Sequence, residues 1–125
     1  MKLLLDTRAA LWWLDNDERL GAAAARELVN EANRVMLSAV VIWEVAIKRS
    51  LGKLQAPHDL ASILIGAGAQ PLAITLDHAA AAEALPWHHR DPFDRMLVAQ
   101  ALAEDASIVS QDERLQRYGV QLVWE

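Results

Sequence analysis

Short apolar runs alternate with longer segments of helical periodicity along the whole chain. The runs contain few polar residues, which is typical of strands buried on both faces of a sheet. Strands are predicted at residues 2–5, 35–37, 72–74, 107–110 and 121–123. Helices are predicted at residues 9–14, 20–32, 39–51, 57–67 and 77–84, from residue 94 onward, and at 112–115. This alternation predicts an α/β protein with a mainly parallel central sheet flanked by helices.

Polar residues and proline mark where several of these helices begin. Ser38 and Thr7 each stand just before an apolar helical pattern, so both are expected to cap helices. Pro92 disfavours helix upstream of itself and biases Asp91 toward an extended conformation, so Asp91 is expected in a turn. Asp94 then lies at or just inside the N-terminus of the central helix, where the helix dipole favours a carboxylate.

The composition is that of one folded domain. The chain has 125 residues, of which 54% are hydrophobic, and this is enough to bury a core in a single domain spanning residues 1–125. It contains no cysteine, which excludes disulfides and thiolate metal sites. The apolar run at the N-terminus is too short for a signal peptide, and no later run approaches a membrane span. We therefore expect a soluble, cytoplasmic protein without a membrane partner.

The net charge constrains the possible partners. It is −5, from 12 basic and 17 acidic residues, which by itself argues mildly against a nucleic-acid partner. If four acids form a metal site, 13 acidic residues remain against 12 basic ones, and bound cations offset those four. A nucleic-acid substrate is therefore compatible with this charge only if the protein binds a divalent metal ion.

Three further acids occupy positions as unusual as that of Asp94. Asp6 and Asp112 each follow a strand-like run, at the sheet edge where ligands bind in parallel α/β proteins, although either alone can be a turn residue or a cap. Glu44 is the only charged residue between Val35 and Ile47. Burial of an unpaired carboxylate is costly, so a functional role is favoured over exposure or a simple pair with a lysine four residues later.

Together these acids form a four-carboxylate candidate site: Asp6, Glu44, Asp94 and Asp112. Clustered carboxylates raise one another's pKa unless a cation is present. Ligation by oxygen alone suits Mg²⁺ or Mn²⁺ rather than zinc. A hydrated Mg²⁺ held by few carboxylates leaves room for a substrate phosphate, so the set predicts metal-assisted hydrolysis of phosphodiester bonds.

The chain resembles the PIN-domain ribonucleases of the VapC toxin family, which belong to type II toxin–antitoxin modules. The matching segments read LLLDT (3–7), WWL (12–14), SA (38–39), WEVAIK (43–48), HRDPFDR (89–95), LVAQA (97–101) and VSQD (109–112). No segment alone is specific, but together they span nearly the whole chain in the order that the family shows. The resemblance implies a PIN-like three-layer sandwich.

The resemblance also implies a site and its partners. The acidic site of the family falls on the four acids above, with Asp6 and Asp94 as the chief metal ligands and Glu44 and Asp112 as further candidates. Thr7 and Ser110 take supporting roles, because Ser110 keeps the hydroxyl of the threonine common in relatives. Arg8 stands where relatives often carry histidine. The implied cofactor is Mg²⁺ or Mn²⁺, the substrate is single-stranded or looped RNA, and the partners are a second copy of the chain and a VapB-like antitoxin that blocks the site.

Histidine, arginine and tryptophan residues are further candidates for functional roles. Adjacent histidines in a loop are usually surface residues, so His88 and His89 are left out of catalysis. Arg90 and Arg95 are candidates to steer phosphate or to pair with the acids. The residues considered for dimer or antitoxin contact are Trp12, Trp13 and Trp87.

Two other functional classes are compatible with parts of this pattern. A small phosphohydrolase or phosphoacceptor domain also carries an aspartate after its first strand. It usually needs a second aspartate nearby or a lysine at a later strand end, and the residues around Asp6 offer neither. A non-catalytic PIN-like binding module would be indicated by a missing acid, whereas all four are present.

Overall fold

The computed structural model describes residues 1–125 and contains one five-stranded sheet with the strand order β3-β2-β1-β4-β5. The strands are β1 (Lys2–Leu5), β2 (Arg34–Ser38), β3 (Gln70–Leu72), β4 (Ser107–Val109) and β5 (Leu122–Val123). All four strand pairs are parallel. The predicted mainly parallel sheet is thus confirmed, and the sheet has no antiparallel strand.

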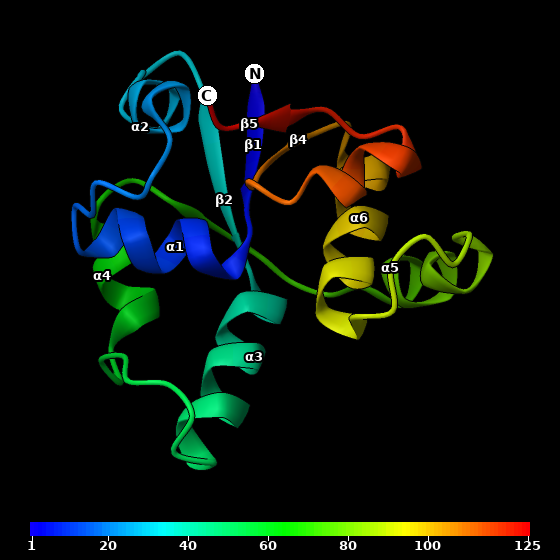
Figure 1. Ribbon diagram of the computed structural model, residues 1–125, viewed down its shortest axis with the longest axis horizontal. Helices are drawn as coiled ribbons and strands as arrows, with labels where there is room; N and C mark the ends of the chain where they lie inside the picture. The colour runs from blue at the N-terminus through cyan, green and yellow to red at the C-terminus, as the bar shows by residue number, and fades with distance from the viewer.

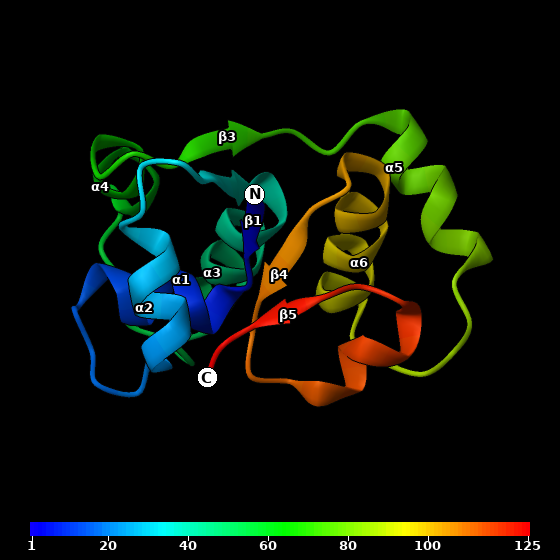
Figure 2. The same ribbon diagram turned by 90° about the horizontal axis from the view of Figure 1, so that it is seen from above.

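Helices cover both faces of this sheet, so the predicted three-layer arrangement is confirmed. The helices are α1 (Thr7–Leu14), α2 (Ala22–Leu28), α3 (Ala39–Ser50), α4 (Leu60–Gly66), α5 (Leu76–Ala81) and α6 (Pro92–Glu104), with 3-10 helices η1 (Ala82–Ala84) and η2 (Glu113–Tyr118). Helices α1, α2 and α4 lie on one side of the sheet and α5 and α6 on the other, while α3 extends below the strands (Figures 1 and 2). None of these helices has the length and apolar character needed to cross a membrane.

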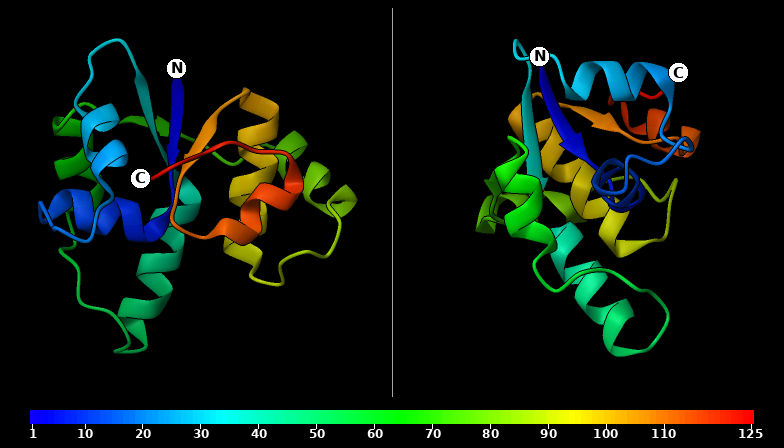
Figure 3. Two further views of the ribbon diagram at one scale, coloured as in Figure 1. Left: turned by 45° about the horizontal axis from the view of Figure 1, so that its top comes forward. Right: turned by 90° about the vertical axis from the view of Figure 1, so that its left-hand side faces the viewer.

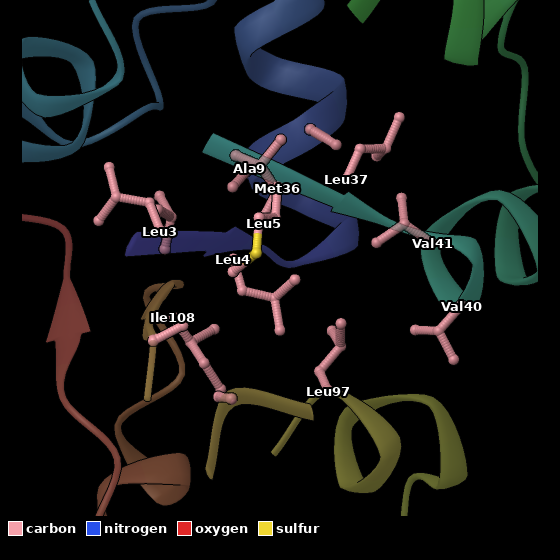
Figure 4. Close-up of a cluster of buried hydrophobic side chains, with 14 of the residues drawn as sticks. Leu3, Leu4, Leu5, Ala9, Met36, Leu37, Val40, Val41, Leu97 and Ile108 are labelled. Carbon is pink, nitrogen blue, oxygen red and sulfur yellow. The ribbon is translucent and has the colours of Figure 1, made fainter. Parts of the chain in front are cut away.

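The core forms where both helical layers meet the central strand. Leu3, Leu4 and Leu5 of β1 are fully buried, as the continuous apolar run predicts for a central parallel strand. Figure 4 shows side chains of β2, α3, α6 and β4 packed around them, among them Leu97 and Ile108. Because β1 is held from both sides, the residue that follows it has a firmly determined position.

Some predicted boundaries are wrong. Helix α2 ends at Leu28 rather than near residue 32, because Asn30 forms a turn in which its side chain accepts the amide hydrogen of Ala32. Helix α4 begins at Leu60, after a turn, and not at Pro57. Strand β3 begins at Gln70, two residues before the predicted start, since proline is tolerated on an edge strand and the chain then turns away toward α5. The short helix predicted at 112–115 is the 3-10 helix η2.

The helix caps agree with the sequence prediction except at α1. Asp91 is the N-cap of α6, and its side chain accepts the amide hydrogens of Phe93 (2.8 Å) and Asp94 (3.2 Å). Asp94 therefore lies in the first turn of α6, just inside the helix N-terminus as predicted. Asp6, rather than Thr7, caps α1, whereas Ser38 caps α3 as predicted. Figure 3 shows that α1, α3 and α6 all begin near the same end of β1.

A buried polar pair fixes α6 against the sheet. Ser38, at the end of β2, donates its hydroxyl hydrogen to Gln100 Oε1 of α6 at 2.6 Å, and both residues are fully buried. Gln100 Nε2 in turn donates to the carbonyl of Ala73 at 3.2 Å. Since buried polar groups are costly without partners, these bonds favour one register of α6 relative to β2. The N-terminal turn of α6 is thereby held over the carboxyl ends of the strands.

Candidate active site

A pocket of about 410 Å³ opens at the carboxyl ends of β1 and β4, between the first turn of α6 and the side of α3. None of its ten lining residues is hydrophobic. The acidic lining residues are Asp6, Glu44, Asp91, Asp94 and Asp112, the basic ones are Arg8, Lys48 and Arg114, and Thr7 and Gln111 complete the lining. The four acids singled out in the sequence thus line one pocket, and Asp91 joins them.

Asp6 follows β1 directly and accepts the amide hydrogen of Ala9 through Oδ1 at 2.8 Å. Burial raises the pKa of this carboxyl above its usual value, and the negative charge of Glu44 raises it further. Hydrogen bonds from the Ser110 side chain and the Ala9 amide oppose that rise. The positive charge of Arg8 also opposes the rise, but no basic side chain forms an ion pair with Asp6. A cation that enters the pocket therefore stabilises this carboxylate.

Glu44 is both buried and paired with a lysine, although these are alternatives in the sequence analysis. It is 6% exposed, so it is buried, yet it also pairs with Lys48 Nζ one turn further along α3. Thr7 donates its hydroxyl hydrogen to Glu44 Oε1 at 2.6 Å. The Thr7 side chain therefore orients an acid of the pocket, in place of the capping role predicted for it. Both carboxylate oxygens of Glu44 already have a hydrogen-bond donor.

The surroundings of Asp94 raise the pKa of its carboxyl group strongly. Burial raises its pKa to about 7, and the negative charges of Asp91, Asp6 and Glu44 act in the same direction. Its side chain is 24% exposed, so it reaches the pocket while being largely removed from water. A carboxyl group in this state binds a proton near neutral pH unless a metal ion or a basic side chain replaces it.

Asp112, like Glu44, is already paired with a basic side chain. Arg114 donates to it through Nε (2.9 Å), Nη2 (2.8 Å) and the backbone amide (3.1 Å). The side-chain bonds from Arg114 lower the pKa of Asp112 to about 2. Ser110, which precedes it, accepts the amide hydrogen of Asp112 at 3.0 Å. Glu44 and Asp112 are therefore each paired with a lysine or arginine, whereas Asp6 and Asp94 are not.

The placement of His89 on the surface is wrong. His89 is 8% exposed, and its Nε2 lies 3.1 Å from Asp112 Oδ2 and 3.2 Å from Asp94 Oδ2. His88, by contrast, is exposed as predicted. No local sequence signal distinguishes the two histidines, because the burial of His89 depends on side chains that come from α6 and η2.

The proposed roles of Arg95 in steering phosphate or pairing with the acids are also wrong. Its guanidinium is buried and donates to the carbonyls of Pro86 (2.9 Å), Ala82 (3.0 Å) and Leu85 (3.2 Å). Arg95 therefore anchors the segment before α6 and does not line the pocket. Trp87, which is 74% exposed, lies over this guanidinium at 3.7 Å. Arg90 is exposed and does not line the pocket either.

The two N-terminal tryptophans are less accessible than Trp87. Trp12 and Trp13 are both partly buried and pack against the hydrophobic core. The ring of Trp12 lies 5.8 Å from that of Trp124, and Arg19 lies over it at 4.9 Å. Much of their surface is therefore used within the chain. Trp43 of α3 is more exposed, at 55%.

The chemistry of the pocket suits a divalent cation. Five carboxylates face three basic side chains, and the unpaired carboxylates are those whose pKa burial raises. The donor atoms are almost all oxygens, which are the ligands that Mg²⁺ and Mn²⁺ prefer. Asp94, Asp112 and His89 also offer ligand atoms within 4.8 Å of one another.

Comparison with known proteins agrees with this fold. Ribonuclease VapC22 of Mycobacterium tuberculosis is 29% identical over 119 residues, which cover 93% of this chain and 91% of that protein. The structure of VapBC2 from Rickettsia felis bound to a DNA fragment from their promoter matches over 100% of both chains, with a TM-score of 0.73 and 16% identity. DNA-bound VapBC from Salmonella typhimurium matches over 98% of this chain and 96% of that chain, with a TM-score of 0.69 and 17% identity.

The structural matches show a shared fold. The family assignment comes from the sequence itself, because the family model of the PIN domain matches residues 3–121, nearly the whole chain. The resemblance noted from the sequence motifs is thereby confirmed. This chain belongs to the PIN-domain family.

Proposed function

We propose that this protein is the toxin of a type II toxin–antitoxin module and acts as a metal-dependent endoribonuclease. The observation that carries the proposal is the pocket of five carboxylates without any apolar lining residue, in which Asp6 and Asp94 have a raised pKa. The similarity to a VapC ribonuclease supports the same class of activity. A single PIN domain over residues 1–125 is part of this proposal.

The cofactor of the proposed enzyme is Mg²⁺ or Mn²⁺. Asp6 and Asp94 are its proposed protein ligands, since neither carboxylate is paired with a lysine or arginine and both gain from a cation. Glu44 and Asp112, whose oxygens are occupied by Lys48, Thr7 and Arg114, are proposed to act around the ion rather than on it. Such outer partners keep ligands oriented and add negative potential to the pocket.

A divalent ion, when bound, would lower the pKa of water near it and would stabilise the negative charge that develops on a phosphodiester during hydrolysis. Three basic side chains, Arg8, Lys48 and Arg114, also line the pocket, and their positive charge is expected to attract the RNA backbone. Arg8 is exposed, so it is free to contact the RNA backbone. Thr7 and Ser110 hold Glu44 and Asp6 in place through their hydroxyl groups.

The first experiment tests metal dependence with RNA. Purified protein is incubated with a mixed pool of single-stranded and structured RNAs in Mg²⁺ or Mn²⁺, with and without excess EDTA. We expect endonucleolytic cleavage that EDTA abolishes. Cleavage that is unaffected by EDTA contradicts the proposal. Metal-dependent hydrolysis of a small phosphate ester without RNA cleavage indicates a phosphohydrolase, and no hydrolysis at all indicates a binding module.

The second experiment tests the residues. Asp6→Asn and Asp94→Asn are expected to lower the cleavage rate by at least about 100-fold, beyond the loss typical of partners outside the metal ligands. Asp77→Asn serves as the matched control, because Asp77 is also an acid in the first turn of a helix but is exposed and does not line the pocket. Equal activity of Asp94→Asn and wild type contradicts the assignment of Asp94.

The proposed partners are a VapB-like antitoxin and a second copy of the chain. The fold neighbours include complexes named VapBC, which supports an antitoxin partner. An arginine or similar cation on the antitoxin is expected to pair with the unpaired acids of the pocket and to compete with Mg²⁺. Trp12, Trp13 and α3 are the proposed apolar contacts. Antitoxin affinity that is unaffected both by Mg²⁺ and by Asp94→Asn would mean that the partner binds elsewhere.

A further inference from the structure

His89 is the buried side chain at the pocket that the proposed function leaves without a role. It lies in the segment between η1 and α6, where its neighbours His88 and Arg90 are exposed. Its backbone amide donates to the hydroxyl oxygen of Tyr118 at 2.9 Å, and its ring points toward the acids. The ring thus contacts two of the acids that line the pocket, Asp94 and Asp112.

The hydrogen bonds of the ring determine where its proton lies. The backbone amide of Asp91 donates to His89 Nδ1 at 3.1 Å, which requires a lone pair on Nδ1. The single ring proton is therefore on Nε2. This N–H group donates to Asp112 Oδ2 at 3.1 Å, and the same nitrogen lies 3.2 Å from Asp94 Oδ2.

The position of this proton decides whether His89 is a metal ligand or a hydrogen-bond donor, which the distances alone do not. His89, Asp94 and Asp112 have ligand atoms within 4.8 Å of one another, as the ligands of a metal ion do. A histidine that binds a metal ion must direct an unprotonated nitrogen at it. Here the unprotonated nitrogen faces the amide of Asp91, and the nitrogen that faces the carboxylates carries the proton. The ring is therefore arranged as a hydrogen-bond donor to the acids.

The ring also connects two segments that each supply an acid. Asp91 caps α6 and contacts His89 through its backbone amide, so the orientation of the ring is coupled to the first turn of that helix. Asp112 begins η2 after β4. The ring thus bridges the N-terminus of α6 and the end of β4, and it sets the separation of their carboxylates.

We propose that His89 is a positioning residue of the proposed metal site: it holds Asp112 through its Nε2 proton and lies against Asp94, without ligating the ion. This inference rests on the proposed function, because it assumes that the pocket binds a divalent ion. In this role His89 orients Asp94, which binds the ion, and Asp112, which acts around it.

Two substitutions test the Nε2 donor of the ring separately from its Nδ1 acceptor. His89→Gln places an amide donor near the position of Nε2. His89→Asn places its carbonyl near Nδ1, where it can accept from Asp91, but has no group that reaches Asp112. Neither change removes the bonds by which Arg95 anchors the segment before α6, so both variants are expected to fold. His88→Asn, at the exposed neighbour, is the control.

The measurement is calorimetric titration of Mn²⁺ into each protein without RNA. We expect His89→Asn to weaken Mn²⁺ binding by about 10-fold to 100-fold, as is typical when a partner of metal ligands is lost. We expect His89→Gln to stay within about 3-fold of wild type and His88→Asn to match it. Equal affinity of His89→Asn and wild type overturns the inference while leaving the proposed function intact. A loss in His89→Gln as large as in His89→Asn also overturns the donor role. No Mn²⁺ binding by wild type contradicts the proposed function itself.

A second measurement needs no variant. The ¹⁵N chemical shifts of the His89 ring report which nitrogen carries the proton, both in metal-free protein and in saturating Mg²⁺. We expect a protonated Nε2 and an unprotonated Nδ1 in both states. A ring protonated on Nδ1 in the Mg²⁺-loaded protein would mean that Nε2 ligates the ion, and it would overturn the positioning role.

Discussion

The neutralisation of Asp94 is the perturbation that most directly tests the electrostatics of the pocket. In the metal-free protein its carboxyl has a pKa of about 7, whereas the ordinary value is 3.8. At about 1.4 kcal/mol per pKa unit this difference corresponds to roughly 4 kcal/mol. Because the side chain is 24% exposed, solvent reduces this figure, and we take roughly 2 to 4 kcal/mol as the expected range.

The direction of the pH dependence follows from which state holds the proton. Below pH 3.8 the Asp94 carboxyl is protonated in both the folded and the unfolded chain. Between pH 3.8 and about 7 the unfolded chain loses this proton while the folded chain keeps it, so the free energy of unfolding falls as the pH rises. Above pH 7 both states are ionised, and the folded state carries the full penalty.

Asp94→Asn replaces the ionisable carboxyl group with a neutral amide of the same size. The variant is expected to be close to wild type in stability near pH 4 and more stable by roughly 1 to 3 kcal/mol at pH 8. That range includes a loss of about 0.3–1 kcal/mol, because the carboxylate no longer interacts with the dipole of α6. The N-cap bonds remain, since Asp91 makes them.

The assay is urea unfolding in EDTA, followed by circular dichroism at pH values from 4 to 8. Asp77→Asn, at the exposed acid in the first turn of α5, is the control and should not gain stability over wild type as the pH rises. A difference between Asp94→Asn and wild type that does not change with pH, or a variant less stable than wild type at pH 8, refutes the reasoning. Added Mg²⁺ should stabilise wild type and do so far less in Asp94→Asn.

Three further substitutions test the contacts around the site by urea unfolding. Thr7→Val removes the hydroxyl that donates to the buried Glu44, and it should cost about 1–3 kcal/mol. Gly21→Ala places a Cβ atom 2.1 Å from the carbonyl oxygen of Trp124, so the C-terminal segment must shift at a cost of about 1–3 kcal/mol. Arg95→Met leaves several backbone carbonyls without a donor and should cost roughly 3 kcal/mol or more.

For each of these three substitutions, wild-type stability would contradict the contact on which the prediction depends. Wild-type stability of Thr7→Val would show that the carboxylate finds another donor. Wild-type stability of Gly21→Ala, with unchanged tryptophan fluorescence, would show that the C-terminal segment yields freely. If Arg95→Met unfolds at the same urea concentration as wild type, the segment before α6 does not depend on the guanidinium.

The sequence by itself determined the architecture and the identity of the four acids. The apolar run 3–5 followed by Asp6, and the alternation of such runs with helices, are local patterns that largely specify a parallel α/β sheet. In such a sheet the carboxyl ends of neighbouring strands meet, so the sequence predicts that Asp6 and Asp112 lie at the same edge. The capping role of Ser38 is also predictable, because capping depends on residues close in the chain.

Only the tertiary structure decided how the residues of the site differ from one another. Asp94 and Asp112 are both aspartates in polar segments, yet burial raises the pKa of the first and Arg114 lowers that of the second. His88 and His89 are adjacent and identical in type, but only His89 is enclosed by side chains from α6 and η2. Burial and pairing depend on groups that are far apart in the sequence and meet only once the chain is packed, and local periodicity contains no information about those contacts.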